Sequence, residues 1–379
     1  MSWKFKKEFE STSDSHSEVT FVVTVFNQVE IIHRVLLSIS EMSSKNFDLV
    51  IIDDCSTDGT SSEIARFLES ISNPKLSSFN QRAGRLASYK SKFSFFETEC
   101  DNFGILKSVT DMIVLIQSDI EITELNFDEK MYLALKSSPD LFMISGRGVA
   151  NENVVRFESL VTRGNPIRTT IVKLARRVLR VLGRKELIPA PGFPEADREV
   201  TTELFETIFP NEEKFLSGGT AGWRGQLLDL WNQLPESQTG YPNKIWIGQY
   251  VMRGPVAFMR ERYNLLGGFD RSAFFLGFDD LDLCLKARSN FGWRVGFVPL
   301  SFNSPMAWGT TRKKRSYVQM FLVFLWSVSK ARKFRKSTLW AHKTGKSPVA
   351  LATPEVLEYL GPNTLKTLNA DFRPGHPID

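Results

Sequence analysis

The stretch LVIIDDCSTDGTSSEIARFL, residues 49–68, ends a run of aliphatic residues on two adjacent aspartates, Asp53 and Asp54. The aliphatic run has the length and composition of a buried strand, and the residues after the polar turn have helical spacing. Thr60 followed by Glu63 has the spacing of a capping box at the start of that helix. Because buried carboxylates need partners or water, the acidic end of this strand predicts either a ligand site or a set of internal hydrogen bonds.

Two further aliphatic runs of strand length occur at 19–27 and 111–119, and stretches with helical spacing lie at 29–39 and 102–109. Strands that are aliphatic on both faces and alternate with helices predict a parallel sheet covered on each side. In such sheets ligands bind beyond the carboxyl ends of the strands. We therefore expect the paired aspartates and Asp119, which ends another strand, to face one crevice.

The totals are those of a folded globular protein: 379 residues, of which 42% are hydrophobic and 24% charged. The formal net charge of +5 is mild and is compatible with anionic small partners such as nucleotides or with lipid headgroups. No nucleic acid is expected as a partner. The cysteines, Cys55, Cys100 and Cys284, are odd in number and lack metal-ligand spacing, which is typical of reduced thiols in a cytoplasmic protein.

The first residues lack the apolar centre of a signal peptide, so 1–18 is expected to be a polar leader. No run approaches the roughly 18 to 20 apolar residues that cross a bilayer, and an integral membrane protein is not expected.

Several motifs together resemble those of the family 2 glycosyltransferases, which have the GT-A fold. They are TVFNQVE (24–30), IDDCSTDGT (52–60), and GFDDLDLCLKAR (277–288) between LLGGFD and WRVGFVP, with LIQSDIEI (115–122) where the family has Asp-X-Asp. In order and spacing the likeness covers roughly 19–125 and 250–303.

The resemblance implies an α/β GT-A fold: a Rossmann-like, mostly parallel central sheet with helices on both faces. A helical insertion and a C-terminal helical extension complete the expected chain. The expected organisation is a leader at 1–18, a catalytic domain at 19–310 and the extension at 311–379. Within the catalytic domain we expect a nucleotide-binding half at 19–125, the insertion at about 151–245, and an acceptor and catalytic half at 246–310.

The resemblance also implies a nucleotide-diphosphate sugar as donor. The first strand end would hold the nucleoside through backbone and packing at Thr24 and Phe26, and Asp53 or Asp54 would accept a hydrogen bond from a base N–H. Asn102 could contact the nucleotide or only cap its helix. The expected donor contacts are Thr24, Phe26, Asn27, Asp53, Asp54, Asn102, Gln117, Ser118 and Asp119.

At the Asp-X-Asp position this chain has Gln117-Ser118-Asp119, so one carboxylate is missing. The resemblance implies that Asp119 meets a divalent cation, Mg²⁺ or Mn²⁺, which would neutralise charge on the departing nucleotide. The loss of one acid leaves strict metal dependence open. Many relatives supply a histidine after the strand that ends near residue 300, where this chain has Asn303 and Ser304.

Asp279 and Asp280 stand where the family has Glu-Asp at the start of a helix. The resemblance implies that Asp280 is the general base of an inverting transfer and that Asp279 orients the acceptor or a neighbour. The expected activity moves a sugar to a hydroxyl of a glycan or a lipid-linked saccharide. Two acids that only cap the helix remain the alternative for this pair.

Two basic amphipathic stretches, 167–185 and 316–336, fit binding to an anionic lipid surface, and packing on the catalytic domain is an equal alternative. The expected location is cytoplasmic, with a peripheral place on the inner face of a membrane as a possibility. A noncatalytic nucleotide-sugar-binding protein on a degenerate transferase fold is the alternative function. A sugar-nucleotide nucleotidyltransferase is disfavoured, because no Gly-rich basic signature follows the first strand.

Overall fold

The computed structural model describes 4–13, 15–72, 82–147, 149–150, 171, 226–228, 245–248, 250–251, 253–274, 277–298, 300–304, 308 and 317–343. Within the expected insertion at about 151–245, the structure describes only 171, 226–228 and 245. The rest of the insertion, including nearly all of its basic stretch 167–185, lies outside the described residues. The same holds for 344–379 of the expected C-terminal extension.

A ten-stranded sheet forms the centre of the molecule. Its order is β1 (Phe5–Thr12), β4 (Ala83–Ser91), β3 (Phe47–Asp53), β2 (Val19–Val25), β5 (Met112–Gln117), β12 (Val256–Met259), β7 (Leu141–Ser145), β13 (Arg294–Phe297), β10 (Ile245–Gly248) and β9 (Gln226–Leu228). The strands β4, β3, β2 and β5 run parallel, as do β7 and β13. The strand β12 runs antiparallel to both β5 and β7, so those two point the same way. The expected mostly parallel α/β sheet is confirmed.

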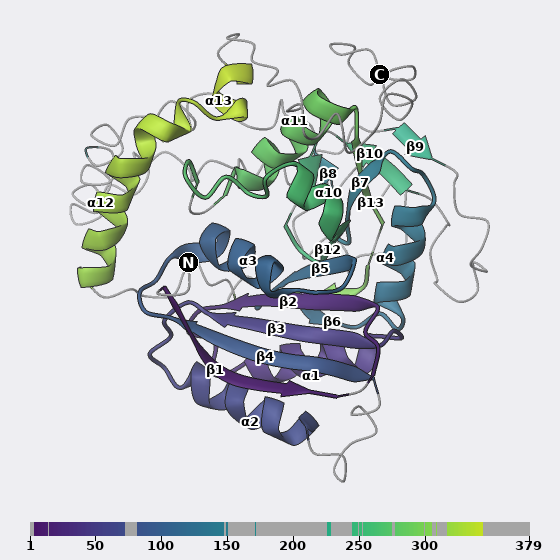
Figure 1. The fold of residues 1–379 in the computed structure, drawn as a ribbon, viewed down its shortest axis with the longest axis vertical. Coiled ribbons are helices and arrows are strands. Elements are labelled where there is room, and N and C mark those ends of the chain that lie inside the picture. Colours follow the sequence, from purple (N-terminus) through teal and green to yellow (C-terminus); the bar gives the residue numbers. More distant parts are fainter. Residues whose placement is uncertain are drawn as a thin grey trace, which may run out of the picture.

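Helices cover both faces of this sheet (Figure 1). One face packs against α1 (Ile32–Met42), α2 (Thr60–Ser72) and α4 (Phe127–Lys136). The other face packs against α3 (Phe96–Lys107), α10 (Arg260–Leu265) and α11 (Asp279–Phe291). Alternate residues of β2 enter the two cores, Val22 on the α3 side and Val23 on the α1 side, which is why the strand is aliphatic throughout.

The polar N-terminal stretch contributes to the sheet. Residues Phe5–Thr12 form β1, an edge strand antiparallel to β4. Most of its side chains are exposed or half-buried, and Phe5 is buried. Lysines and glutamates are suited to an edge strand because they discourage pairing with other chains. Part of the expected leader is therefore an edge strand.

Two details near the strand ends differ from the sequence-based expectation. The Asp58 carboxylate accepts the Thr60 backbone N–H at 3.1 Å, while Glu63 pairs with His33 at 2.9 Å. The capping box expected at Thr60 and Glu63 is therefore wrong, and Asp58 caps α2. The helix α3 begins at Phe96, six residues before the start expected from the sequence at 102.

Glycine lets α3 approach the sheet closely. A Cβ on Gly104 would lie 2.4 Å from Cγ1 of Val22, so a larger residue at this position would push α3 away from β2. This contact sets the distance between the helix and the strand end that Thr24 occupies.

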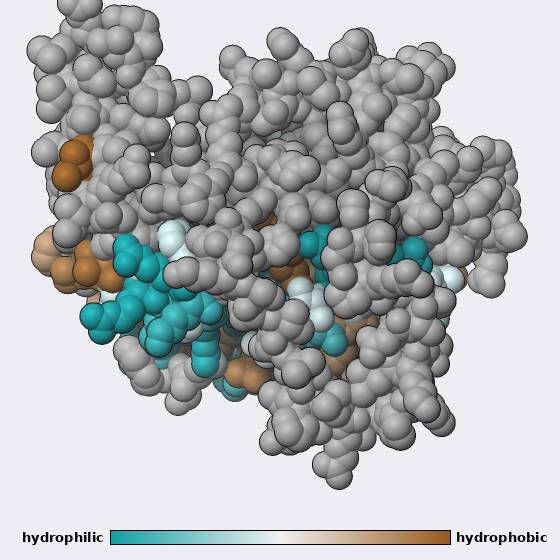
Figure 2. Space-filling model, turned by 90° about the horizontal axis from the view of Figure 1, so that it is seen from above, coloured by the Kyte–Doolittle hydropathy of each residue, from teal (hydrophilic) through white to brown (hydrophobic). Residues whose placement is uncertain are grey.

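The C-terminal helices α12 (Tyr317–Phe334) and α13 (Thr338–Lys343) reach the α11 side of the sheet. Phe334 packs edge-on against Phe274, with ring centroids 5.5 Å apart. The Leu339 backbone N–H donates to Asp282 of α11 at 2.8 Å. Figure 2 shows hydrophobic side chains next to hydrophilic ones on the side of the molecule where α12 lies. No helix in the described ranges has both the length and the hydropathy of a membrane span.

Two short strand pairs lie outside the main sheet. The strand β6 (Glu121–Ile122) pairs with β14 (Phe302–Asn303), and β8 (Val149–Ala150) pairs with β11 (Tyr250–Val251). The first pair brings the segment after β5 next to the segment near residue 300.

Candidate functional site

The carboxyl ends of three neighbouring strands line up at one edge of the sheet. In the register of the ladders, Thr24 of β2 lies opposite Gln117 of β5, and Val25 lies opposite Asp53 of β3. The ends of these three strands thus lie side by side, and the expectation that Asp53, Asp54 and Asp119 face one crevice stays a prediction. This is the edge at which ligands bind in parallel α/β sheets.

The loops that follow β2 and β3 are joined by Asn27. Its backbone N–H donates to Ser56 Oγ at 2.9 Å, and its side-chain oxygen accepts the Thr57 N–H at 2.9 Å. Asn27 has φ of 50°, a conformation that asparagine tolerates better than most residues. Phe26 beside it is 3% exposed. Phe26 thus serves packing, and Asn27 fixes the shape of the crevice edge.

Asp53 is buried and bonded to its own turn. One oxygen accepts the Ser56 N–H at 2.8 Å, and the other accepts a hydrogen bond from Ser61 and lies 3.8 Å from Lys90 Nζ. These bonds shape the turn between β3 and α2. Contact with a nucleobase stays a prediction for Asp53.

Asp54 caps α3 from a distance in the chain. Its carboxylate accepts the backbone N–H groups of Phe95 at 2.6 Å and Phe96 at 3.1 Å, and the Ser94 hydroxyl at 2.6 Å. Its exposed fraction is 1%. A carboxylate at a helix N-terminus is stabilised by the unpaired amides there. The acidic strand end is thus held by internal partners, and any nucleobase contact by Asp54 would have to share them.

At the Asp-X-Asp position the side chain of Gln117 is engaged with the protein. Its Nε2 donates to Glu97 Oε1 at 2.8 Å, and its Oε1 accepts from Arg147 Nη1 at 3.3 Å. The Ser118 hydroxyl is buried and has no hydrogen-bond partner in the part of the chain that the structure describes. Asp119, just beyond β5, is partly exposed.

At the Asp-X-Asp position a divalent cation would find the single carboxylate of Asp119. Among the described residues no group of three or more His, Cys, Asp or Glu side chains has the arrangement of a metal site. Glu121 is paired with Arg34 at 2.6 Å and with Asn303 at 3.0 Å, so it is not available as a second ligand. Mg²⁺ often binds through one carboxylate plus substrate phosphates. Asp119 and the unpaired Ser118 hydroxyl fit an ion held mainly by a diphosphate.

The start of α11 is joined to the end of β2 through buried charges. Asp279 is fully buried, and its Oδ2 accepts hydrogen bonds from Thr98 Oγ1 at 2.6 Å and from Arg253. Arg253 Nη1 donates to Asp101 Oδ2 at 2.5 Å. Asp101 in turn accepts the Thr24 hydroxyl at 2.6 Å. The acidic pair at the start of α11 and the end of β2 are therefore linked through residues of α3.

Asp280 follows in the first turn of α11 and is partly exposed. Its Oδ1 accepts the Leu281 N–H at 2.8 Å. Burial, and then the neighbouring charge of Asp279, raise the pKa of Asp280 to about 7, while Arg253 opposes that rise. A carboxylate with a pKa near neutrality is suited to accept a proton at physiological pH. Asp279, by contrast, is fully buried and bonded to Thr98 and Arg253, and a contact with an acceptor stays a prediction for it.

Sequence reasoning missed Arg253, Glu97 and Asp101. Burial raises the pKa of Asp101 to about 7, with Arg253 opposing the rise and Glu97 adding to it. Arg253 is bonded to partners 152 and 26 residues away, and it stands just before β12 with no motif around it. Its only sequence signal is a lone arginine beside a strand, which is too common to single out.

Asn102 lies in the middle of α3, so its expected place at a helix start is wrong. Its Nδ2 donates to the Phe269 carbonyl at 3.0 Å, and its Oδ1 accepts the Tyr263 hydroxyl at 2.8 Å. A Cβ on Gly268, which has φ of +70°, would lie 2.8 Å from that Oδ1. Asn102 therefore joins α3 to the Gly-Gly turn before α11, and a nucleotide contact stays a prediction.

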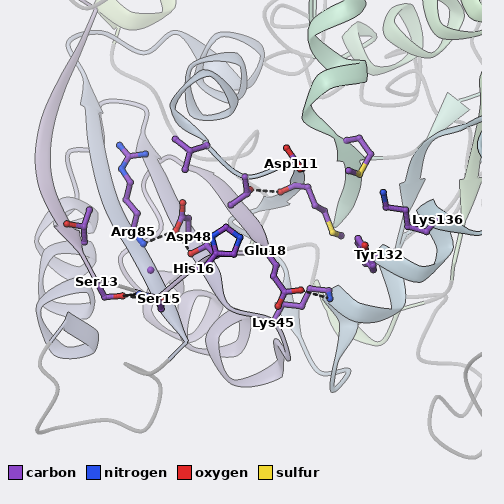
Figure 3. Close-up of a pocket in the computed structure, with 17 residues that line it drawn as sticks. Ser13, Ser15, His16, Glu18, Lys45, Asp48, Arg85, Asp111, Tyr132 and Lys136 are labelled. Carbon is purple, nitrogen blue, oxygen red and sulfur yellow. Dashed lines mark hydrogen bonds and ion pairs between the residues drawn. The ribbon is translucent and has the colours of Figure 1, made fainter. Parts of the chain in front are cut away.

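A separate pocket of about 610 Å³ lies at the opposite edge of the sheet, where β2, β3 and β5 begin (Figure 3). Its charged side chains face one another: Lys45 lies 3.2 Å from Glu18 and 2.5 Å from Glu129. Arg85 lies 2.9 Å from Glu10, and Asp48 accepts the Ser17 hydroxyl. These contacts engage Lys45, Glu18, Arg85 and Asp48, and the pocket lies away from the carboxyl ends of the strands.

Comparisons with known proteins agree with the sequence motifs. Residues 20–97 match the model of glycosyl transferase family 2. None of the curated proteins compared with the chain matches it.

Solved structures similar to this chain include a mannosyltransferase, TarS and GalNAc-T7. The mannosyltransferase PcManGT from Pyrobaculum calidifontis, in complex with GDP-Man and Mn²⁺, is 16% identical, with a TM-score of 0.40 over 94% of this chain and 85% of that one. TarS from S. aureus is 14% identical, with a TM-score of 0.39 over 86% and 41% of the two chains. GalNAc-T7 with UDP, GalNAc and Mn²⁺ is 11% identical, with a TM-score of 0.47 over 96% and 59%.

The family match spans β2, the loop with Asn27, β3 with its aspartate pair and the beginning of α3. These elements include the ends of β2 and β3, which lie at the edge of the sheet described above. Over residues 20–97, which include these strand ends, the chain is therefore similar to glycosyl transferase family 2.

Proposed function

We propose that this protein is an inverting glycosyltransferase that moves a sugar from a nucleotide diphosphate to a hydroxyl of a glycan or a lipid-linked saccharide. The observation that carries the proposal is the tie between α11 and the donor edge of the sheet. Asp279, beside Asp280, shares Arg253 with Asp101, which holds Thr24 at the end of β2. One chain of buried hydrogen bonds and ion pairs would thus fix the base relative to the nucleotide site.

On the donor side, the ends of β2, β3 and β5 would hold the nucleotide. The loop fixed by Asn27 and the packed ring of Phe26 shape its edge. Asp119 would meet the diphosphate together with Mg²⁺ or Mn²⁺, and the neighbouring Ser118 hydroxyl is buried without a hydrogen-bond partner among the described residues. When bound, the cation would supply neutralisation of the charge that develops on the leaving nucleotide.

On the acceptor side, Asp280 would remove the proton of the attacking hydroxyl. Inversion requires this attack from the side of the sugar opposite the leaving nucleotide, so the base and the diphosphate site must face each other across the anomeric carbon. The pKa of Asp280, near 7, leaves it largely ionised at slightly alkaline pH and strong enough to accept a proton. Asp279 and its partners would keep this turn in place.

A panel of nucleotide sugars tests the proposal. Thermal unfolding would be followed with UDP, GDP, UDP-glucose, UDP-N-acetylglucosamine and GDP-mannose, with and without Mn²⁺, because a ligand of the folded state raises the melting temperature. The donors that stabilise the protein would then be assayed for release of their nucleotide with mixed oligosaccharide acceptors. We expect Asp280→Asn to keep the thermal shift and to lose release. Retained release in that variant would refute the base assignment, and the absence of any shift would refute a nucleotide-sugar donor.

A peripheral membrane location for α12 is a second part of the proposal. Phe321, Leu325 and Val328 are 60%, 47% and 45% exposed, and their spacing puts them on one helical face. The exposed Arg332 continues the same face, and the exposed Arg335 follows in the turn after the helix. An apolar stripe followed by cations fits the headgroup region of an anionic membrane, and it agrees with the neighbouring hydrophobic and hydrophilic surface in Figure 2.

Vesicle sedimentation tests this location. We expect the protein to sediment with phosphatidylglycerol vesicles more than with phosphatidylcholine vesicles, and a variant with serine at the three apolar positions of α12 to lose the difference. Serine at Leu106 and Leu125, which are 62% and 65% exposed elsewhere, is the matched control. Equal sedimentation of both variants and the parent would contradict membrane binding by α12 and would favour packing of this helix on the rest of the protein.

A further inference from the structure

One buried arginine holds together acids from two parts of the chain. The Arg253 side chain is 8% exposed, and its Nη1 lies 2.5 Å from Asp101 Oδ2 and 3.0 Å from Glu97 Oε1. Its other terminal nitrogen donates to Asp279. The guanidinium also stacks over the ring of Phe269, 4.7 Å from its centroid. Its fork geometry allows a single side chain to bind carboxylates on α3 and α11 at once.

Glu97 connects the same arginine to Gln117, the first residue of the Asp-X-Asp position. Glu97 accepts Gln117 Nε2 at 2.8 Å with the oxygen that faces Arg253. An aspartate at 117 would set a second carboxylate against Glu97, and like charges at that distance repel. A neutral amide donor suits the place, which gives a physical reason for the glutamine where the family has an acid.

We propose that Arg253 is a positioning residue for sugar transfer: through Asp279 and Glu97 it holds the turn that carries Asp280 in register with the end of β5. This inference rests on the proposed function. In this proposal a single side chain sets the distance and orientation between the base and the diphosphate site. That side chain belongs neither to the acidic pair of α11 nor to the Asp-X-Asp position. A misplacement of about 1 Å between reacting groups can lower a rate by roughly 100-fold.

The charges around Asp280 give the proposal a second consequence. Asp279 precedes it on α11, Glu97 lies on α3, and both add negative charge, while Arg253 opposes them. Asp101, also on α3, faces the same guanidinium. Removing the guanidinium would leave the carboxylates uncompensated, so Asp280 would hold its proton to higher pH. A residue that served only overall stability would not change that proton affinity.

The experiment uses the full chain and a donor that shifts its melting temperature, with nucleotide release as the assay. For Arg253→Met we expect kcat to fall by about 100-fold or more, while KM for the donor changes by no more than about threefold. The acid limb of the pH profile should move up by about one unit. Arg253→Lys keeps the charge but loses the fork, so its acid limb should stay near that of the parent while kcat falls.

Arg294→Met is the matched control. Arg294 pairs with Asp140 at 2.9 Å at the opposite edge of the sheet, where β7 and β13 begin. Its loss should lower stability without changing the pH profile. Unchanged kcat and an unchanged acid limb in Arg253→Met would overturn the inference. If that variant fails to fold, Arg253→Lys and Glu97→Gln decide in its place, and normal kcat in both would overturn it.

Failure of the proposed function gives a different result. A parent protein that releases no nucleotide from any donor in the panel contradicts the transferase activity itself, and the positioning role falls with it. A parent that turns over while the Arg253 variants behave as Arg294→Met contradicts the positioning role alone.

Discussion

Two neighbouring acids on the first turn of α11 should respond in opposite ways to the same substitution. Asp280→Asn should raise the free energy of unfolding at pH 8, and Asp279→Asn should lower it. The reason is their different surroundings. Asp280 has its pKa raised to about 7 by burial and by the charge of Asp279. Asp279 accepts hydrogen bonds from Thr98 and Arg253 and is fully buried.

The magnitude for Asp280 follows from the pKa change. A rise from 3.8 to about 7 means that the folded protein binds this proton more tightly than the unfolded chain does. The resulting stability is fully present below about pH 4 and is lost as the pH rises through about 7. The upper limit of the effect is about 4 kcal/mol. Because Asp280 is partly exposed and coupled to Asp279, we expect a gain of about 1–2 kcal/mol at pH 8 and less than half of it at pH 5.

For Asp279, the amide keeps one acceptor but removes the charge that faces Arg253. Breaking a buried, charge-assisted pair costs about 2–4 kcal/mol. The two variants therefore differ in sign although they are adjacent in sequence and remove the same charge. Asp280→Asn would then lose transfer but gain stability. Such opposition is common where catalysis requires a charged group in surroundings that disfavour its charge.

The assay is urea unfolding followed by tryptophan fluorescence, at pH 5 and pH 8, with the parent and both variants. The pH comparison separates the titration of Asp280 from any change in packing. An Asp280→Asn protein that is less stable than the parent at pH 8, or whose advantage is equal at both pH values, would refute the reasoning. Equal destabilisation by both substitutions would assign Asp280 to the same structural role as Asp279.

Three further predictions concern the crevice. The value of kcat/KM should rise with pH along an acid limb near 7, because ionised Asp280 accepts the proton, and a flat profile between about pH 5.5 and 8 would contradict this. Asp119→Ala should weaken nucleotide-diphosphate binding by calorimetry in the presence of Mn²⁺ but not in its absence; equal weakening in both would exclude a metal role. Asp54→Ala should cost about 3 kcal/mol in urea unfolding, because the N-terminal amides of α3 lose their acceptor. Unchanged stability with lost nucleotide affinity would instead support a base contact.

The elements around β3 could be predicted from the sequence because their signals are local. The aliphatic run 47–53 coincides with β3, and the helix expected after Thr60 is α2. The start of α11 at Asp279 also agrees with the expected position of the acidic pair. In each case the residues that define the element are consecutive or one helical turn apart.

Features that depend on distant partners were not predicted. The sequence left a ligand site and internal hydrogen bonds both open for the aspartate pair, and it gave no sign that Asp54 caps α3 about forty residues later in the chain. The edge strand β1 was missed because its lysines and glutamates suit a solvent-exposed leader as well as a sheet edge. Arg253 has no local pattern, since its function in the fold is defined by acids on α3 and α11.

The most direct test of the central claim is a crystal structure of the Asp280→Asn protein with the nucleotide sugar that stabilises it and Mn²⁺. We expect the diphosphate beside Asp119 and the anomeric carbon between it and the residue at 280, with the nucleoside along the ends of β2 and β3. A nucleotide sugar found instead in the pocket beside Lys45 and Arg85, at the other edge of the sheet, would contradict the claim.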